Sequence, residues 1–357
     1  MPTSTASDDA DIAPALAERV RAAGAAGTAL RIVGGDSKAF HGRTVPGEPL
    51  HIAGHRGVID YQPSELVITA RAGTPVAEVE ALLARSGQML AFEPPLFAPA
   101  STLGGVVAAG LSGPRRPFAG AVRDFVLGVR ILDGQGRSLR FGGTVFKNVA
   151  GFDAFRPMAG ALGCLGVLLE VSLRVAPRPR AEVSLAFELD WPAARARVTA
   201  LMRRPLPVSG AWCDGRRLHL RLSGPEAAVR AAARELGGEE TRLELWQDVR
   251  NMKHGLLTAP RLWRLSVPQA AELPAIDGQW LWDWGGAQRW LVSEADATSI
   301  RAAAAAAGGH ATLFRGHRPG EAVFTPLPAP LMDLHRRLKA AFDPAGVLNP
   351  GRMYEGL

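Results

Sequence analysis

The sequence predicts an α+β protein with two domains and a C-terminal segment, and three observations lead to this prediction. Its 357 residues (37.8 kDa) exceed what one hydrophobic core usually organises. Pro177 and Pro179 interrupt the chain near its midpoint, as residues at a domain boundary do. Beyond them, stretches typical of strands and helices alternate. We therefore place a first domain at residues 10–179, a second at 180–325 and a C-terminal segment at 326–357.

The first domain contains two helix signals and five strand signals. Apolar residues at helical spacing predict a helix over residues 12–26, and a second helix begins after Thr74 as N-cap, with Pro75 at its first position, and ends at Gly87. Runs rich in β-branched and aliphatic residues predict strands at 29–33, 66–70, 125–132, 138–141 and 167–175. Asp133 and Gly134 form the turn between the third and fourth of these strands.

The second domain and the tail continue with helices that carry clear end signals. Strands are expected at 183–189 and 218–222, and helices at about 191–203, capped by Asp190, at 225–236 and at 294–307. An amphipathic helix near 331–342 ends at Asp343-Pro344. Trp280, Trp282 and Trp284 alternate, which puts all three on one face of a strand. A buried core is the ordinary interpretation of that face, and an exposed one would mark a subunit contact.

Composition and charge exclude several classes of protein. An apolar fraction of 47% with 21% charged residues excludes a disordered chain. The net charge of +7 would suit an acidic partner, but the arginines are scattered and only 6% of residues are aromatic, so we expect no nucleic-acid binding. The two cysteines, Cys164 and Cys213, exclude both a disulfide framework and an iron–sulfur cluster held by this chain alone.

No segment of the sequence predicts direct insertion into a membrane. The N-terminus lacks the basic and apolar regions of a secretory signal, so we expect a cytoplasmic protein. The longest uncharged stretch, residues 94–114, contains four prolines and four glycines. Such a backbone cannot satisfy its own hydrogen bonds in lipid, so we interpret this stretch as a buried loop region.

Two glycine-rich segments in the first domain are candidates for binding chemistry. The loop Gly34-Gly35-Asp36-Ser37-Lys38 directly follows a strand, and its amides could form an anion-binding nest beside a hydroxyl and a cation. Its spacing fits neither the Rossmann nor the Walker motif, and an ordinary turn is the alternative. Residues 99–113 are small and uncharged and either pack against a flat or polyanionic ligand or form a tightly packed helix and loop; they include Pro99, Ser101, Thr102, Gly104, Gly105, Gly110 and Gly113.

Two further segments that contain glycine are also candidates for binding a ligand. Gly160, Gly163 and Gly166 lead into the apolar strand that starts at Val167, either beside a ligand or at a crossing where side chains do not fit. Residues 342–352 form a rigid ending in which Asn349 can both donate and accept hydrogen bonds. One nest of amide bonds at about 1.5–3 kcal/mol each cannot offset association costs of about 4–15 kcal/mol. A long cofactor that contacts several of these segments can be retained.

Taken together, these segments resemble one family of flavoproteins. The loop 34–38, the stretch from Ser101 to Arg116, the run Lys147-Asn-Val-Ala-Gly-Phe, the Gly163–Val167 strand entry and the ending 342–352 are similar to the FAD-binding subunit, the E subunit, of bacterial glycolate oxidase. That subunit belongs to the proteins with a two-subdomain FAD domain of the p-cresol-methylhydroxylase type. The resemblance spans about residues 12–354.

The resemblance implies a cofactor and a set of residues that contact it. FAD is expected to bind non-covalently, because relatives with covalent flavin carry a histidine in the first glycine loop, where this chain has Asp36. Lys38, Arg115 or Arg352 would stabilise the anionic reduced flavin, and residues 180–325 would form a short cap. The residues expected to bind FAD are Gly34, Gly35, Asp36, Ser37, Lys38, Pro99, Ser101, Thr102, Gly104, Gly105, Gly110, Gly113, Arg115, Gly163, Gly166, Val167 and Asn349.

The resemblance also implies a function, with one departure. Family members that oxidise 2-hydroxy acids carry a histidine-rich metal motif, which none of the eight histidines here forms, so we expect no metal and assign no catalytic residue. The chain would be the FAD-binding subunit of a glycolate oxidase or dehydrogenase that forms glyoxylate, with an electron-transfer or supporting role. Its partners would be a catalytic flavoprotein subunit and an iron–sulfur subunit, in the cytoplasm or peripheral at the inner membrane. The alternatives are a scaffold subunit without flavin and a stand-alone FAD-dependent 2-hydroxy acid dehydrogenase.

Overall fold

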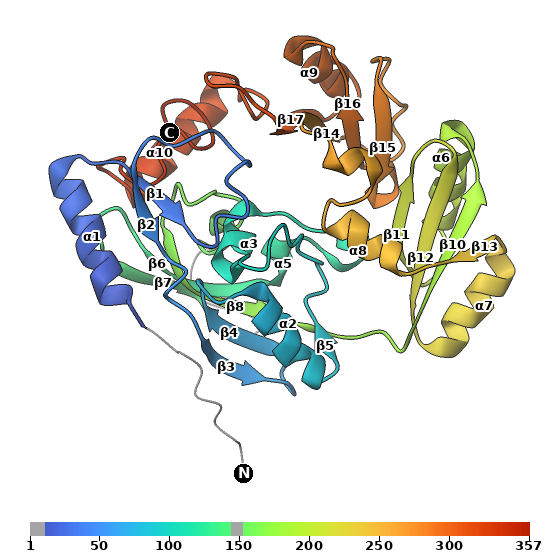
Figure 1. Ribbon diagram of the computed structural model, residues 1–357, viewed down its shortest axis with the longest axis horizontal. Coiled ribbons are helices and arrows are strands. Elements are labelled where there is room, and N and C mark those ends of the chain that lie inside the picture. Colours follow the sequence, from blue (N-terminus) through green and yellow to red (C-terminus); the bar gives the residue numbers. More distant parts are fainter. Residues whose placement is uncertain (1–10, 144–152) are drawn as a thin grey trace.

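The computed structural model describes residues 11–143 and 153–357 of the chain. Figure 1 shows two lobes, each built around its own sheet, with the end of the chain returning to the first lobe. Pro177 ends the last strand of the first lobe, and Pro179 lies in the connection to the first strand of the second. The run 147–152, used above for the resemblance, lies outside the described residues.

The first lobe is centred on an antiparallel sheet, which among the described residues has five strands. Their order is β3 (Val58–Gln62), β4 (Val67–Arg71), β8 (Val167–Arg174), β6 (Val126–Leu132) and β7 (Ser138–Gly142). Beside it lie a parallel pair, β1 (Leu30–Val33) and β2 (Glu48–His51), and a short antiparallel pair, β5 (Gln88–Met89) and β9 (Ala176–Pro177). The helices of this lobe are α1 (Ala13–Ala26), α2 (Val76–Arg85), α3 (Leu103–Ala109), α4 (Arg116–Ala119) and α5 (Val122–Phe125).

The elements predicted for this lobe agree with the structure within two residues, but one cap does not, and β2, β3, β5, β9, α4 and α5 were not predicted. Helix α1 ends at Gly27, whose φ of 65° is the left-handed conformation that glycine adopts without strain. Helix α2 has Pro75 rather than Thr74 at its N-cap. The Thr74 hydroxyl instead accepts from the backbone N–H of Gly57 at 2.9 Å and donates to the Gly57 carbonyl at 3.2 Å. The predicted cap was wrong because a non-local partner competes for this hydroxyl.

The second lobe contains an eight-stranded sheet in which every neighbouring pair is antiparallel. The strand order is β13 (Glu239–Thr241), β10 (Ala181–Glu188), β12 (Arg217–Gly224), β11 (Val208–Cys213), β15 (Gln279–Asp283), β16 (Gln288–Val292), β14 (Leu262–Ser266) and β17 (His310–Arg315). The two halves meet at β11 and β15 through the single pair Cys213 and Trp282. The sheet is therefore two four-stranded halves joined at a narrow contact.

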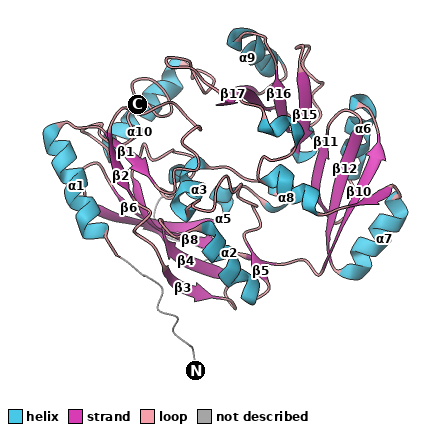
Figure 2. Cartoon of the chain, in the orientation of Figure 1, coloured by secondary structure: helices cyan, strands magenta, loops and turns pink. Residues whose placement is uncertain are grey.

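Helices cover one face of this sheet and the first lobe covers the other (Figure 2). On the outer face, α6 (Trp191–Leu201), α7 (Glu226–Leu236) and α9 (Ala297–Ala306) bury alternate residues of the strands. On the inner face, large aromatic side chains such as Trp212, Trp290 and Phe314 pack with α8 (Glu244–Arg250) and with Ala109, Leu111 and Leu162 of the first lobe. One apolar cluster among the described residues thus spans the two lobes.

The tryptophan prediction is partly confirmed. Trp280 and Trp282 lie in β15 and pack beneath the outer helices, so they form part of the core and no exposed aromatic face. Trp284 lies beyond the end of the strand with a φ of 55°, and its indole Nε1 donates to the Gly113 carbonyl at 2.9 Å. The expectation that all three share one strand face was wrong for Trp284, because the backbone turns out of the strand there.

The C-terminal segment closes the first lobe. Helix α10 (Ala329–Phe342) leads into residues that lie beside β1, where the Leu30 N–H donates to Val347 at 2.7 Å and the Asn349 N–H donates to Leu30 at 2.9 Å. The buried ammonium of Lys339 holds the turn, with Nζ 2.6 Å from the Asp343 carboxylate and 2.7 Å from the Leu348 carbonyl. The segment therefore returns to the first lobe and lies beside β1, as predicted.

The uncharged stretch 94–114 forms loops on either side of the short helix α3. Within the described ranges, the chain has no helix with both the length and the apolar character needed to cross a bilayer.

Candidate functional site: a groove formed by four segments

Segments that are far apart in the sequence meet at one groove on the first lobe. The groove opens to solvent and, with the open space at its mouth included, holds about 630 Å³. It adjoins a smaller cavity, and residues from all four glycine-bearing segments line the two spaces. The lining residues common to both are Ile32, Gly34, Thr102, Gly105, Ala108, Leu162 and Asn349. This convergence places the predicted segments where one extended ligand can contact all of them.

The loop Gly34–Lys38 supplies a run of unused backbone donors. None of its five amide N–H groups donates to a protein acceptor in the part of the chain that the structure describes. The loop lies directly against the next segment, and a Cβ at Gly35 would lie 1.6 Å from the Ala100 carbonyl oxygen. Only glycine allows this approach. Successive free amides in such a loop form the nest that binds phosphate oxygens.

Lys38 adds an uncompensated positive charge to this loop. Its Nζ lies 3.4 Å from the Ser37 hydroxyl and 5.8 Å from the centre of the Phe97 ring, and no carboxylate of the described residues lies within ion-pair distance. Burial lowers the pKa of Lys38 to about 8. A bound anion would offset this desolvation, so the side chain is suited to a phosphate group.

Helix α3 contributes a wall to the groove but no free amides at its start. The N–H groups of Leu103 and Gly104 donate to the carbonyls of Thr74 and Ala72 at 2.9 and 2.8 Å, and Gly105 donates to the Thr102 hydroxyl at 3.3 Å. The first turn of α3 is therefore already satisfied by the protein. The free backbone donors that face this groove therefore belong to the loop 34–38, while α3 presents its small residues as a surface.

Asn349 fastens three of the segments together at the floor of the groove. Its Oδ1 accepts from the Ile32 N–H at 2.8 Å, and its Nδ2 donates to the Leu162 carbonyl at 2.6 Å. Gly163 packs so closely that a Cβ there would lie 2.7 Å from Nδ2. The amide has a second Nδ2 hydrogen, so it can still donate to a ligand while it holds the groove in shape.

Several residues that the sequence placed at the cofactor lie outside the groove. Ser101 lies just beneath it, where its hydroxyl is 2.9 Å from that of Ser37. Gly104 and Gly166 line the smaller cavity, whereas Asp36 and Ser37 line the larger groove. The remaining residues line neither space: Pro99 is exposed, Gly110 caps α3, Gly113 and Arg115 face the second lobe, and Val167 lies in the core of the sheet.

The structure distinguishes between the three cationic residues that were expected to stabilise the reduced flavin. Arg352 lines the groove, but its guanidinium donates to the carbonyls of Lys38, Ala39, His41 and Arg43. Arg115 pairs with Glu93 and Glu182. Both arginines are therefore held by the protein through several carbonyls or carboxylates, whereas Lys38 contacts only the Ser37 hydroxyl and the Phe97 ring among the described residues.

Sequence reasoning missed several groove residues that have no motif of their own, among them Arg31, Ile32 and Ala108. Arg31 and Ile32 precede the glycine loop at the end of β1, and Ala108 follows Gly105 by one turn of α3. The helical spacing of Ala108 from Gly105 was the available signal. Among the described residues, no three His, Cys, Asp or Glu side chains are arranged to hold a metal ion.

Comparisons with known proteins agree with this geometry. Residues 12–142 match the FAD binding domain model, and residues 325–353 match the C-terminal domain model of FAD linked oxidases. The glycolate oxidase subunit GlcE of Escherichia coli is 49% identical over 350 residues, which cover 98% of this chain and 99% of that protein. The chain belongs to the GlcE family of glycolate oxidase subunits. The predicted family, its FAD cofactor and its oxidoreductase class are thereby confirmed.

Relatives beyond the GlcE family match parts of the chain or the fold alone. The glycolate oxidase subunit GlcD of Bacillus subtilis is 34% identical over 85 residues, which cover 24% of this chain and 18% of GlcD. A structure of alkyldihydroxyacetonephosphate synthase has a TM-score of 0.66 at 15% identity and covers 94% of this chain and 74% of its own. That likeness confirms the predicted fold class.

The groove fits FAD on its own geometry. A groove with a run of free amides and the Lys38 ammonium at its glycine loop suits a pyrophosphate, and the apolar walls from α3 and Leu162 suit flat rings.

Proposed function

We propose that this chain is the FAD-binding subunit of a multi-subunit glycolate oxidase, in which it supports the oxidation of glycolate to glyoxylate. Bound FAD would supply electron transfer. The observation that carries the proposal is the convergence of four dispersed segments on a groove whose glycine loop offers five free amides and Lys38. The near full-length identity to a glycolate oxidase subunit GlcE supports the substrate.

Within the groove, we assign a distinct task to each segment. The amides of Gly34–Lys38 bind the pyrophosphate and Lys38 neutralises part of its charge. Thr102, Gly105 and Ala108 form a wall of small residues against which a ring can lie. Asn349 orients the floor of the groove and offers its second Nδ2 hydrogen to the cofactor. We also retain residues 10–179, 180–325 and 326–357 as FAD domain, cap and flavin-contacting tail.

The proposed partner subunits follow from the cluster and metal ligands that the sequence of this chain lacks. Its two cysteines cannot ligate an iron–sulfur cluster, and its histidines form no metal motif of the family's substrate-oxidising members. We therefore propose that a catalytic flavoprotein subunit holds the metal-dependent substrate site and that an iron–sulfur subunit carries electrons onward. We place the complex in the cytoplasm or peripherally at the inner membrane.

The test is to purify this chain alone and with its candidate partner subunits. We expect about one FAD per chain after denaturation, and glycolate turnover with a dye acceptor only when the partners are added. A colourless chain that takes up no FAD would favour the scaffold subunit. Dye-linked oxidation of a 2-hydroxy acid by the isolated chain would favour the stand-alone dehydrogenase.

A further inference from the structure

A buried carboxylate, Glu93, lies between the two lobes of the molecule. It directly precedes Pro94 and Pro95, and its side chain is only 10% exposed. Its φ of 48° is uncommon for a residue other than glycine. A charge buried this deeply persists only when it is paired, so its partners define its role.

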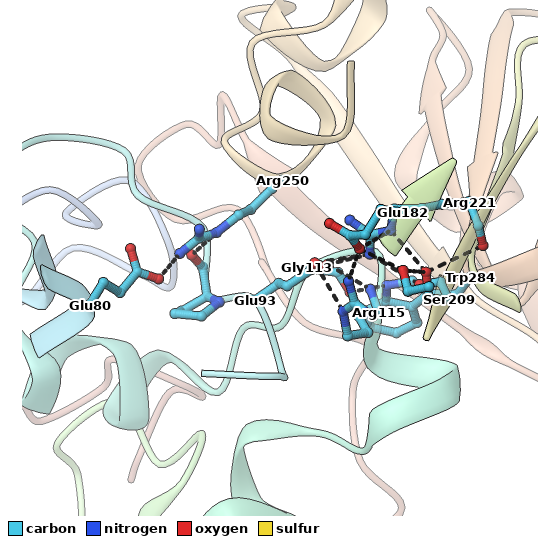
Figure 3. Close-up of polar contacts among 11 residues, drawn as sticks. Glu80, Glu93, Gly113, Arg115, Glu182, Ser209, Arg221, Arg250 and Trp284 are labelled. Carbon is cyan, nitrogen blue, oxygen red and sulfur yellow. Dashed lines mark hydrogen bonds and ion pairs between the residues drawn. The ribbon is translucent and has the colours of Figure 1, made fainter. Parts of the chain in front are cut away.

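The partners of Glu93 come from both lobes (Figure 3). In the first lobe, Oε2 accepts from the Arg115 backbone N–H at 3.0 Å and Oε1 accepts from the Arg115 Nε at 3.2 Å. In the second lobe, Nη2 of Arg221 on β12 lies 2.9 Å from Oε1 and 3.0 Å from Oε2. Burial alone would raise the pKa of Glu93, but Arg221 and Arg115 hold it below its ordinary value.

Glu93 and Arg115 stand at the two ends of the segment that forms one wall of the groove. Between them lie Thr102, Gly105 and Ala108, which line it. The ends are also joined by the Gly113 N–H, which donates to Phe92 at 2.9 Å, and a Cβ at Gly113 would lie 2.4 Å from the Glu93 carbonyl oxygen. The pair therefore closes the base of this wall.

Side chains of the second lobe also hold the two ends of this wall segment together. Arg221 is held by Ser209, whose hydroxyl and carbonyl lie 3.1 Å from its Nε and Nη2. Arg115 continues to Glu182 at 2.7 Å, and the Trp284 indole donates to the Gly113 carbonyl. The base of the wall is therefore set by side chains of the second lobe that do not line the groove.

We propose that Glu93 is a positioning residue for FAD, which couples the docking of the second lobe to the shape of the groove wall. The inference rests on the proposed FAD site and goes beyond it. Because coupling between two equilibria is reciprocal, FAD binding must also tighten the contact between the lobes. The resemblance placed Gly113 and Arg115 among the FAD-binding residues, although neither lines the groove. In this proposal they act by closing the base of the wall.

The experiment compares Glu93→Gln with a matched control, Glu80→Gln. Glu80 on α2 also pairs across the lobes, with Arg250 at 2.5 Å, but it lies outside the wall segment. We expect E93Q to raise the Kd for FAD by roughly 5- to 150-fold, the usual range for coupling between two sites. The Kd of E80Q should stay within about twofold of the wild-type value. The visible circular dichroism of FAD at saturation should change in E93Q and not in E80Q.

Proteolysis of the interlobe connection near residues 177–180 gives the reciprocal readout. FAD should slow cleavage of the wild-type chain and of E80Q, but not of E93Q. Should E93Q fail to fold, Arg221→Gln removes the same pair from the second lobe and is expected to weaken FAD binding although Arg221 does not line the groove. The inference is overturned if E93Q or R221Q binds FAD as the wild type does, or if both Glu variants lose affinity in proportion to their loss of Tm. A wild-type chain that binds no FAD would overturn the proposed function as well.

Discussion

Lys38 is a cation with no carboxylate of the described residues within ion-pair distance. We expect FAD to bind its protonated form, so the affinity should be highest below the Lys38 pKa of about 8 and should fall as the pH rises through that value. Kd values for FAD between pH 7 and 9.5 measure this. Lys38→Arg should remove the dependence and keep most of the affinity, whereas Lys38→Met should weaken binding about 10- to 100-fold at pH 7. Identical pH profiles for the wild type and K38R would contradict the role of Lys38.

Gly35 is the residue at which the groove is least tolerant of a side chain. Gly35→Ala would place a Cβ 1.6 Å from the Ala100 carbonyl oxygen, so the loop 34–38 must shift away from the wall segment. We expect a lower Tm and a loss of FAD affinity greater than tenfold by titration. Gly143→Ala is the control, because a Cβ at Gly143 meets no atom of the described residues within 4 Å. Equal effects of the two substitutions would refute the close-approach argument.

The turn that follows α10 illustrates how one element depends on a single buried pair. Lys339→Met would leave the Asp343 carboxylate buried without its partner and remove the donor to Leu348. Leaving a buried charge unpaired costs about 3–5 kcal/mol, and we expect a loss of this size in the free energy of unfolding by urea. The double variant K339M/D343N should recover part of it. If the double variant is as unstable as K339M, the effect comes from lost packing instead.

At the scale of elements, sequence signals worked where the stabilising interactions are local. The helices with clear ends were predicted well: α1 stops at Gly27, the Asp190 carboxylate accepts from Ala193 at 3.0 Å at the start of α6, and α7 stops at Gly237. Strands β11, β14, β16 and β17 were not predicted, because their short runs mix polar and apolar residues, and because β14 and β17 pair only with strands that are distant in the sequence. The same limit applied to Thr74 and Trp284, whose partners are non-local.

The residues of the candidate site also divide into those that a local sequence pattern reveals and those that depend on distant parts of the chain. The glycine loop 34–38 could be found from the sequence because its residue types are rare together, and Asn349 could be found from its rigid context. The sequence could not separate residues that line the groove from those that close its base, so Gly113 and Arg115 were placed with Gly105. That distinction depends on the second lobe, which no local pattern reveals.

For the whole molecule, the interface between the lobes predicts a dependence of stability on pH. Burial raises the pKa of Asp283 to about 7, and the Trp284 N–H at 2.7 Å only partly offsets this. Because the folded state holds this proton more tightly than the unfolded chain, the contribution to stability is complete below about pH 4 and is lost as the pH rises to about 7. Relative to Asp283→Asn, the free energy of unfolding of the wild type should fall by up to about 1.4 kcal/mol per pH unit in that window. Parallel curves for the two proteins would show that Asp283 ionises normally.

The return of residues 347–349 to β1 has a consequence for how the cofactor is acquired. Leu30 leaves the ribosome early, but its hydrogen-bonding partners are translated only after the entire second lobe. A nascent chain therefore displays a glycine loop without the floor that Asn349 provides. We therefore expect flavin loading to follow the synthesis of the tail, and a premature stop codon after α10 to yield a nearly full-length polypeptide that does not retain its cofactor.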